Sequence, residues 1–113
     1  MRVVLAMLAA VVLIAAPTAN SYSPEVTAKK AAAKVAICKV FGKYCQQALR
    51  VSWCESRWYV WARNGQYLGL FQMGNYARSR YGHHPSNAWI QARAAYAYFV
   101  DSGRDWSPWS CKP

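Results

Sequence analysis

Glu55 is the residue in this sequence whose type and setting best suit acid–base chemistry. The chain holds only four acidic residues, and Glu55 is the only one between Glu25 and Asp101. Four aromatic residues lie close to it along the chain: Trp53, Trp58, Tyr59 and Trp61. Aromatic surroundings keep water from a carboxyl group and favour its protonated form. A protonated Glu can give its proton to a glycosidic oxygen.

Composition also allows a second interpretation of Glu55. The residue lies at the predicted end of a helix, with Arg50, Arg57 and Arg63 nearby, so it could instead form an ion pair. Composition alone favours neither interpretation, and the choice depends on the motif that contains Glu55.

That motif runs from residue 54 to residue 73. The run Cys54-Glu55-Ser56-Arg57-Trp58 is followed by an Asn64-Gly65 turn and then by Tyr67-x-Gly69-Leu70-Phe71-Gln72-Met73. The pattern resembles the signature of the lytic transglycosylase and goose-type lysozyme superfamily. In that superfamily, a Glu-Ser pair at a helix end precedes the Gln of a Gly-Leu-Met-Gln-like segment by an interval similar to that between Glu55 and Gln72.

The resemblance is closest to the resuscitation-promoting-factor domains and related small actinobacterial transglycosylase-like proteins. Those proteins also place a Cys before the catalytic Glu and end in a Trp-rich tail with a Cys, as Trp106, Trp109 and Cys111 do here. The resemblance covers about Ala48 to Cys111. It departs from the family at Arg57, where a Gly is common, and at Phe71, where a Met is common, and no Ala-Tyr-Asn-Ala-Gly-like element follows.

The resemblance implies a role for each matching position. Glu55 is the expected catalytic acid, Gly69, Leu70, Phe71 and Gln72 are expected to line the cleft, and Asn64 is expected to be a polar residue of the cleft. Aromatic side chains can present flat faces to sugar rings. The full set of expected substrate-binding residues is Asn64, Tyr67, Gly69, Leu70, Phe71, Gln72, Trp58 and Tyr76.

The scarcity of acids bears on the reaction. A hydrolytic glycosidase normally uses two carboxylates, and only Asp101 and Asp105 could supply the second one here. A lytic transglycosylase, as the family implies, needs one Glu. We therefore expect single-Glu cleavage of the β-1,4 bond between N-acetylmuramic acid and N-acetylglucosamine in peptidoglycan. The alternatives are a hydrolytic muramidase and a non-catalytic cationic protein that binds the cell wall or acts against bacteria.

The first residues predict secretion. Met1-Arg2 precedes an uncharged apolar run from Val3 to Ala16, and small residues follow. This is the layout of a signal peptide, and the run is shorter than the roughly 20 residues that span a bilayer. We expect cleavage after residue 21, or after Ala19, and one domain over residues 22–113. The protein is then extracellular and associated with the cell wall.

The four cysteines predict two disulfides, because an even number behind a signal peptide favours a disulfide framework. Three connectivities exist. We favour Cys38–Cys45, which would join two helix ends across Gly42, with Cys54–Cys111, which would fasten the tail to the helix of Glu55. Zinc-ligand spacing is absent from the sequence, so we expect no metal and no cofactor.

The net charge of +10, or about +9 once Arg2 is removed with the signal peptide, indicates an anionic partner. For a secreted protein we expect peptidoglycan glycan strands and anionic wall polymers. We expect no nucleic acid, no stable membrane association after signal cleavage, and a monomer.

Helices must position these residues. Ser23-Pro24-Glu25 predicts a helix start, with the helix running to about Ile37 and Gly42 breaking the pattern. Further helices are expected over 44–56, 76–81 and from Ser86 or Asn87 to Ser102. Residues 57–75 read as a loop with at most a rudimentary hairpin. The expected fold is a mostly α, small lysozyme-like (α+β) domain with two disulfides.

Overall fold

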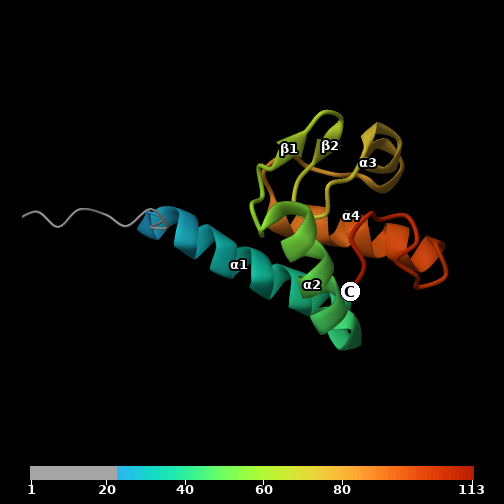
Figure 1. Cartoon of the computed structure of the whole chain (residues 1–113), viewed down its shortest axis with the longest axis horizontal. Coiled ribbons are helices and arrows are strands. Elements are labelled where there is room, and N and C mark those ends of the chain that lie inside the picture. The colour runs from blue at the N-terminus through green and yellow to red at the C-terminus, as the bar shows by residue number, and fades with distance from the viewer. Residues whose placement is uncertain (1–22) are drawn as a thin grey trace, which may run out of the picture.

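The computed structural model describes residues 23–113, so the expected signal peptide lies outside the described residues. The elements along the chain are α1 (Pro24–Phe41), a 3-10 helix η1 (Gly42–Tyr44), α2 (Cys45–Ser56), β1 (Arg63–Asn64), β2 (Tyr67–Leu68), α3 (Asn75–Tyr81) and α4 (Ala88–Asp101) (Figure 1). The mostly helical fold, its small hairpin and both disulfides are confirmed. Within the described part, no helix is long and apolar enough to span a bilayer.

Local side-chain chemistry explains where the helices begin. The Val26 N–H donates to Ser23 Oγ at 3.2 Å, and Pro24 occupies the first position of α1. The Ile90 N–H donates to Asn87 Oδ1 at 2.9 Å at the start of α4. Each cap provides a partner for an N–H that the helix itself leaves unpaired, which is why these two predicted starts are confirmed.

The core is an aromatic cluster between α1, α4 and the C-terminal tail. The ring of Phe41 lies 5.7 Å from Phe99 and 5.6 Å from Trp106, and it stacks on Phe71 at 5.4 Å. All four side chains are buried. Figure 1 shows the tail passing close to α2 after α4 ends. The tail is therefore part of the core, and it brings the end of the chain to the helix that carries Glu55.

Gln91 organises the loops that surround the hairpin. Its side chain is fully buried on α4. The Oε1 atom accepts the Leu70 N–H at 2.8 Å, while Nε2 donates to the carbonyl oxygens of Val60 at 3.0 Å and His84 at 2.8 Å. One amide thus holds three separate stretches of backbone, so the loops before and after the hairpin are fixed relative to α4.

Replacing Gln91 with Leu tests this arrangement. The substitution leaves three backbone groups without their partner, and a buried polar group without a partner costs about 1–3 kcal/mol. We expect the free energy of unfolding to fall by at least about 3 kcal/mol in denaturant titrations with the disulfides intact. The matched control is Gln46→Leu on the exposed surface of α2. A loss below about 1 kcal/mol for Gln91→Leu would show that the loops do not depend on it.

His83 gives a second prediction for the same region. Its Nε2 atom is buried without a partner among the described residues, and the ring lies against Gly69. Burial, and then the charges of Arg78 and His84, lower the pKa of His83 to about 4. The unfolded chain, with an ordinary His pKa near 6.5, then binds more protons than the folded one in this range. We expect the contribution of neutral His83 to the free energy of unfolding to be fully present above about pH 6.5. It should be lost progressively as the pH falls toward 4.

Unfolding titrations across this range measure the effect. His83→Gln should flatten the dependence of unfolding free energy on pH, whereas His84→Gln, which removes only the smallest of the three causes, should leave most of it in place. Equal slopes for wild type and His83→Gln would assign the acid sensitivity to other groups.

Candidate active site

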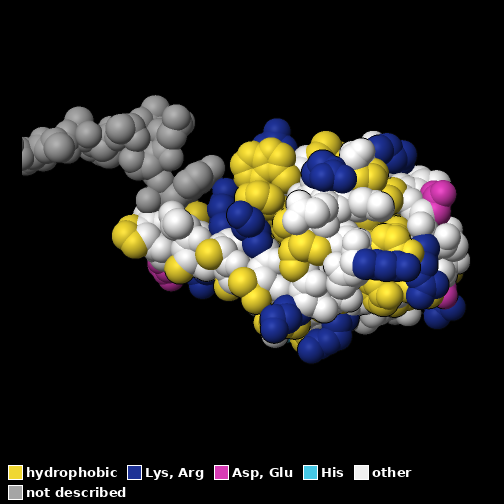
Figure 2. Space-filling view, turned by 90° about the horizontal axis from the view of Figure 1, so that it is seen from below, with side chains coloured by type: hydrophobic (Ala, Val, Ile, Leu, Met, Phe, Trp, Pro, Cys, Tyr) yellow, Lys and Arg dark blue, Asp and Glu magenta, His cyan; other side chains and the backbone are white. Residues whose placement is uncertain are grey.

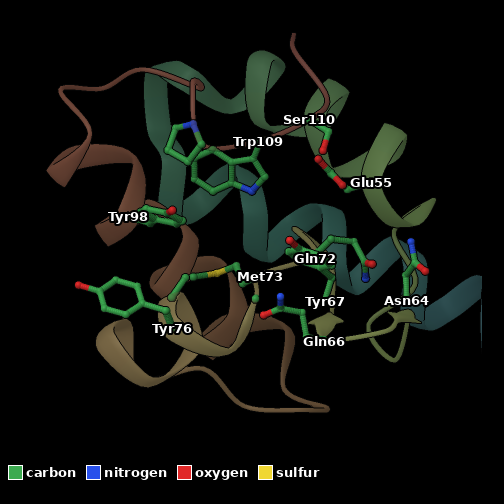
Figure 3. A pocket seen from close by; sticks show the side chains of 13 residues that line it. Glu55, Asn64, Gln66, Tyr67, Gln72, Met73, Tyr76, Tyr98, Trp109 and Ser110 are labelled. Atoms are coloured by element: carbon green, nitrogen blue, oxygen red, sulfur yellow. The ribbon is translucent and has the colours of Figure 1, made fainter.

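A cleft of about 400 Å³ opens beside Glu55. Figure 3 shows Glu55, Ser110 and Trp109 on one side of it, with Gln66, Tyr67 and Tyr76 on the other and Gln72 and Met73 between them. The complete lining comprises Glu55, Asn64, Gln66, Tyr67, Gln72, Met73, Gly74, Tyr76, Ala77, Tyr98, Pro108, Trp109 and Ser110. The structure therefore brings together five of the predicted residues, which are Glu55, Asn64, Tyr67, Gln72 and Tyr76.

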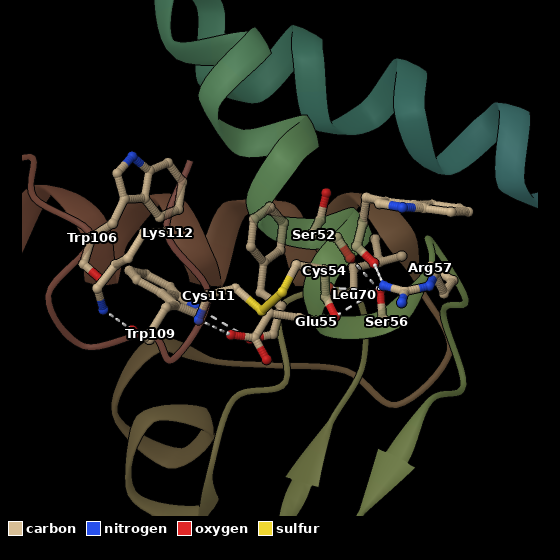
Figure 4. Close-up of a disulfide and its surroundings, with 12 residues drawn as sticks. Ser52, Cys54, Glu55, Ser56, Arg57, Leu70, Trp106, Trp109, Cys111 and Lys112 are labelled. Carbon is tan, nitrogen blue, oxygen red and sulfur yellow. Dashed lines mark hydrogen bonds between the residues drawn. A yellow bond between two sulfur atoms is a disulfide. The ribbon is translucent and has the colours of Figure 1, made fainter.

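Glu55 lies in the last turn of α2, and the tail holds its side chain. The side chain is half-buried, and its Oε2 atom accepts the backbone N–H of Cys111 at 3.1 Å (Figure 4). Cys111 is itself bonded to Cys54, the residue before Glu55. The disulfide that closes the tail therefore keeps the backbone N–H of Cys111 beside the carboxyl group.

Arg57 ends α2, at the position where the transglycosylase signature that the motif resembles commonly has Gly. Arg57 adopts a left-handed backbone with φ 55°, the conformation that favours Gly at helix ends. Its N–H donates to the Trp53 carbonyl at 2.9 Å, and its Nη1 donates to the same carbonyl at 2.7 Å and to that of Cys54 at 3.3 Å. The side chain thus gives the Trp53 carbonyl a second donor and provides one for the Cys54 carbonyl, at a helix end where carbonyl groups lack intrahelical partners.

Ser56 joins this helix end to the segment that follows the hairpin. Its hydroxyl donates to the Leu70 carbonyl at 2.8 Å and accepts the Trp58 N–H at 3.2 Å. The Ser of the Glu-Ser pair is buried, so it fixes the distance between α2 and the segment at residues 69–73. Its role in this fold is to position the cleft.

The expectation that the whole segment 69–72 lines the cleft is corrected. Leu70 and Phe71 are 0% and 1% exposed, so their side chains belong to the core and do not reach the cleft. Gly69 is buried with φ 82°, and an added Cβ would lie 2.6 Å from Gln91 Oε1, so this position requires the absence of a side chain. Only Gln72 faces the cleft, and its Nε2 donates to the Ala62 and Gly69 carbonyls at 3.1 Å each.

Trp58 also lies elsewhere, which corrects its place among the cleft residues. Its indole N–H donates to Ser52 Oγ at 3.2 Å, and its ring packs 4.7 Å from that of Trp53, with Lys34 Nζ 4.4 Å from the ring centre. Trp58 has a left-handed backbone, with φ 61°. None of the aromatic residues nearest to Glu55 in sequence lines the cleft.

The aromatic lining comes instead from the hairpin, from α3 and α4, and from the tail. The residues that the sequence did not identify are Gln66, Met73, Gly74, Ala77, Tyr98, Pro108, Trp109 and Ser110. Trp109 is held by its indole N–H, which donates to the Phe71 carbonyl at 2.9 Å. The predicted Cys54–Cys111 pairing was the one signal that could have placed the tail beside Glu55.

Glu55 is the only carboxylate among the residues that line this cleft. Asp101, the last residue of α4, accepts a hydrogen bond from the Tyr81 hydroxyl at 2.8 Å, and its Oδ2 lies 3.7 Å from Arg80 Nη2 of α3. Asp105 is exposed and accepts the Ser107 N–H at 2.6 Å. Over residues 23–113, no group of three or more His, Cys, Asp and Glu side chains could hold a metal ion. The acid–base chemistry available in the cleft is that of one carboxyl group.

Comparisons with protein families, curated proteins and solved structures find no match for this chain. The interpretation of the cleft therefore depends on its own geometry and on the sequence motif that crosses it.

The two disulfides allow a paired test of how the tail is held. The Cys54–Cys111 disulfide joins residues 57 positions apart and so closes a long loop of the chain. The Cys38–Cys45 disulfide joins residues only 7 positions apart. On the chain-entropy model these closures contribute about 4 and about 2 kcal/mol. We expect Cys54→Ala/Cys111→Ala to lose more unfolding free energy than Cys38→Ala/Cys45→Ala, as measured by denaturant titration. We also expect faster amide exchange at residues 106–111 in the first double variant alone. Unchanged exchange there would show that aromatic packing alone holds the tail.

Proposed function

We propose that this protein is a secreted lytic transglycosylase that cuts the glycan strands of bacterial peptidoglycan with Glu55 as its single acid and base. The observation that carries the proposal is one half-buried carboxyl group on the side of a cleft lined mainly by amide and aromatic side chains. The motif around Glu55 and Gln72 supports the same activity through its resemblance to the transglycosylase signature.

The geometry around Glu55 suits proton transfer. The Cys111 N–H donates to Oε2, and an oxygen that accepts a hydrogen bond in this way is favoured as the carbonyl-like oxygen of a protonated carboxyl group. In the acid form that the proposed reaction requires, the proton is on Oε1, which is the oxygen we propose to face the glycosidic bond. A fixed donor on one oxygen also fixes the direction of the other, and acid catalysis depends on such alignment.

The proposed reaction uses this one carboxyl group twice. Glu55 gives its proton to the oxygen between C1 of N-acetylmuramic acid and C4 of N-acetylglucosamine, and the C1–O bond breaks to release the N-acetylglucosamine end as an alcohol. The Glu55 carboxylate then takes the proton of the muramic 6-hydroxyl while O6 bonds to C1. The product is a 1,6-anhydro end, the proton returns to Glu55, and no water is consumed.

The absence of a second carboxylate in the cleft favours this reaction over hydrolysis. A hydrolytic muramidase normally needs a second carboxylate as nucleophile or as the base for water. Neither Asp101 nor Asp105 lines the cleft. We therefore expect Asp105→Asn to leave cleavage of peptidoglycan intact. A hydrolase that used Asp105 would lose this cleavage in the same variant.

The cleft lining suits an uncharged sugar chain. The side chains of Asn64, Gln66 and Gln72 can exchange hydrogen bonds with hydroxyl and acetamido groups. The rings of Tyr67 and Tyr76 are 46% and 73% exposed, which leaves faces for sugar rings. The two disulfides are consistent with folding in an oxidising compartment outside the cell, and the positive net charge suits an anionic wall.

Glu55→Gln tests the proposal. The substitution removes the proton and keeps the shape and a hydrogen-bond acceptor for Cys111. We expect cleavage of purified peptidoglycan to fall by at least about a hundredfold, in line with the loss of a general acid, while the melting temperature stays nearly unchanged. The assay is release of soluble fragments from purified wall. Glu25→Gln, the same chemical change in the first turn of α1, is the matched control and should retain full activity.

Retention of most activity by Glu55→Gln would refute the central role of Glu55. If Glu55→Gln kills bacteria as well as the wild-type protein does, and neither releases fragments from the wall, the protein is instead a cationic antibacterial protein. In that case Glu25→Gln and Glu55→Gln would behave alike.

A further inference from the structure

Helix α2 presents a second, different surface on the side away from Glu55. Successive residues of an α-helix are separated by about 100° around its axis, so Trp53 and Glu55 point in roughly opposite directions. Trp53 is exposed, and Arg50 lies one turn before it on the same side of α2. The cleft and this second surface therefore belong to one rigid helix and do not share side chains.

We call this surface the basic–aromatic face, and it is formed by Lys29, Lys34, Arg50, Trp53, Trp58 and Trp61. Lys29 Nζ lies 4.9 Å from the ring centre of Trp61, and Lys34 Nζ lies 4.4 Å from that of Trp58. Figure 2 shows hydrophobic and basic side chains intermixed on the side of the molecule that carries α1, with acidic side chains toward the two ends of the view. Cations from α1 thus lie over aromatic rings from α2 and the loop after it.

A hollow of about 540 Å³ lies within this face, lined by Lys34, Gln46, Leu49, Arg50, Trp53 and Trp58. Its floor is apolar and aromatic, while Lys34 and Arg50 stand among its lining residues. No carboxylate lines it. Chemistry of this kind suits a ligand with negative charges spaced along an apolar or polyol chain.

The positive charge of the face is not neutralised within the described residues. Arg80 of α3 pairs with Asp101 of α4 at 3.7 Å, and neither residue belongs to this face. Lys29, Lys34 and Arg50 form no ion pair with a carboxylate in residues 23–113. Uncompensated charges on one surface attract a polyanion over several ångströms, and salt weakens this attraction.

The way the tryptophans lie favours a polymer over a membrane. Trp53 and Trp61 are 42% and 41% exposed, so more than half of the surface of each residue is covered. Lys29 and Lys34 lie over the rings of Trp61 and Trp58, so a ligand that contacts these rings also meets the two ammonium groups. A membrane-inserting Trp would project its ring beyond its neighbours into the boundary of the acyl chains. The basic–aromatic face therefore suits binding of a polyanion that lies along it.

We propose that the basic–aromatic face is a second binding site, for an anionic polymer of the bacterial wall such as a polyol phosphate chain. The choice of a wall polymer rests on the proposed function, whereas the charge and shape of the site do not. Binding there would hold the enzyme on the wall while the opposite side of α2 presents Glu55 to a glycan strand.

The test measures binding of the full mature chain to purified poly(glycerol phosphate) by isothermal titration calorimetry at several salt concentrations. The site variant is Lys29→Gln/Lys34→Gln/Arg50→Gln. The control variant is Lys39→Gln/Lys43→Gln/Arg93→Gln, which removes the same number of exposed charges outside the face. We expect the site variant to bind at least tenfold more weakly than wild type at physiological salt and the control variant to bind less than threefold more weakly. For a linear polyphosphate, removing three contacts should also lower the slope of log Kd against log salt by about two.

Equal losses in the two variants would overturn the proposal, because they would show that diffuse charge is sufficient. Wild-type binding by the site variant would overturn it as well. Tighter binding to phosphatidylglycerol vesicles than to the polymer, lost in the site variant, would assign the face to a membrane. Poly(glycerol phosphate) contains no muramic acid linkage, so this result is independent of whether Glu55 cleaves peptidoglycan.

Discussion

The closure of the C-terminal tail onto α2 is the constraint on which the cleft depends. The Cys54–Cys111 disulfide joins the residue before Glu55 to the end of the chain, and the Cys111 N–H meets the Glu55 carboxyl group. Trp109 anchors the same tail through its indole N–H on the Phe71 carbonyl. Because Pro108, Trp109 and Ser110 form one wall of the cleft, the disulfide both holds that wall in place and keeps the Cys111 N–H in position to orient the acid.

Helix α2 divides the molecule into two surfaces with different chemistry. The side of Glu55 faces a cleft of amides and aromatic rings, and the opposite side carries Trp53 and Arg50 among uncompensated cations. Segregation of this kind keeps Lys and Arg out of the cleft lining. We propose that the same segregation lets the protein stay on an anionic wall while it acts on an uncharged part of it.

The sequence predicted the features that depend on local chemistry. Helix starts at Ser23 and Asn87 follow from capping. Two disulfides follow from an even number of cysteines behind a predicted signal peptide, and the pairing found is the one favoured among three. The direction of side chains in the motif could not be predicted in the same way. Left-handed residues at Arg57, Trp58 and Gln72 turn the chain sharply, so a position within the motif does not say which way its side chain points. For that reason Leu70 and Phe71, expected in the cleft, are in the core.

The oxygen source of the product tests the central claim most directly. Purified peptidoglycan is digested in water enriched in heavy oxygen, and the released fragments are weighed by mass spectrometry. A single-Glu transglycosylase forms its new bond from the muramic 6-hydroxyl, so the account predicts 1,6-anhydro ends that carry no label. Reducing ends that carry one heavy oxygen per cleavage would contradict it, because they would require an attacking water and a second group to activate that water.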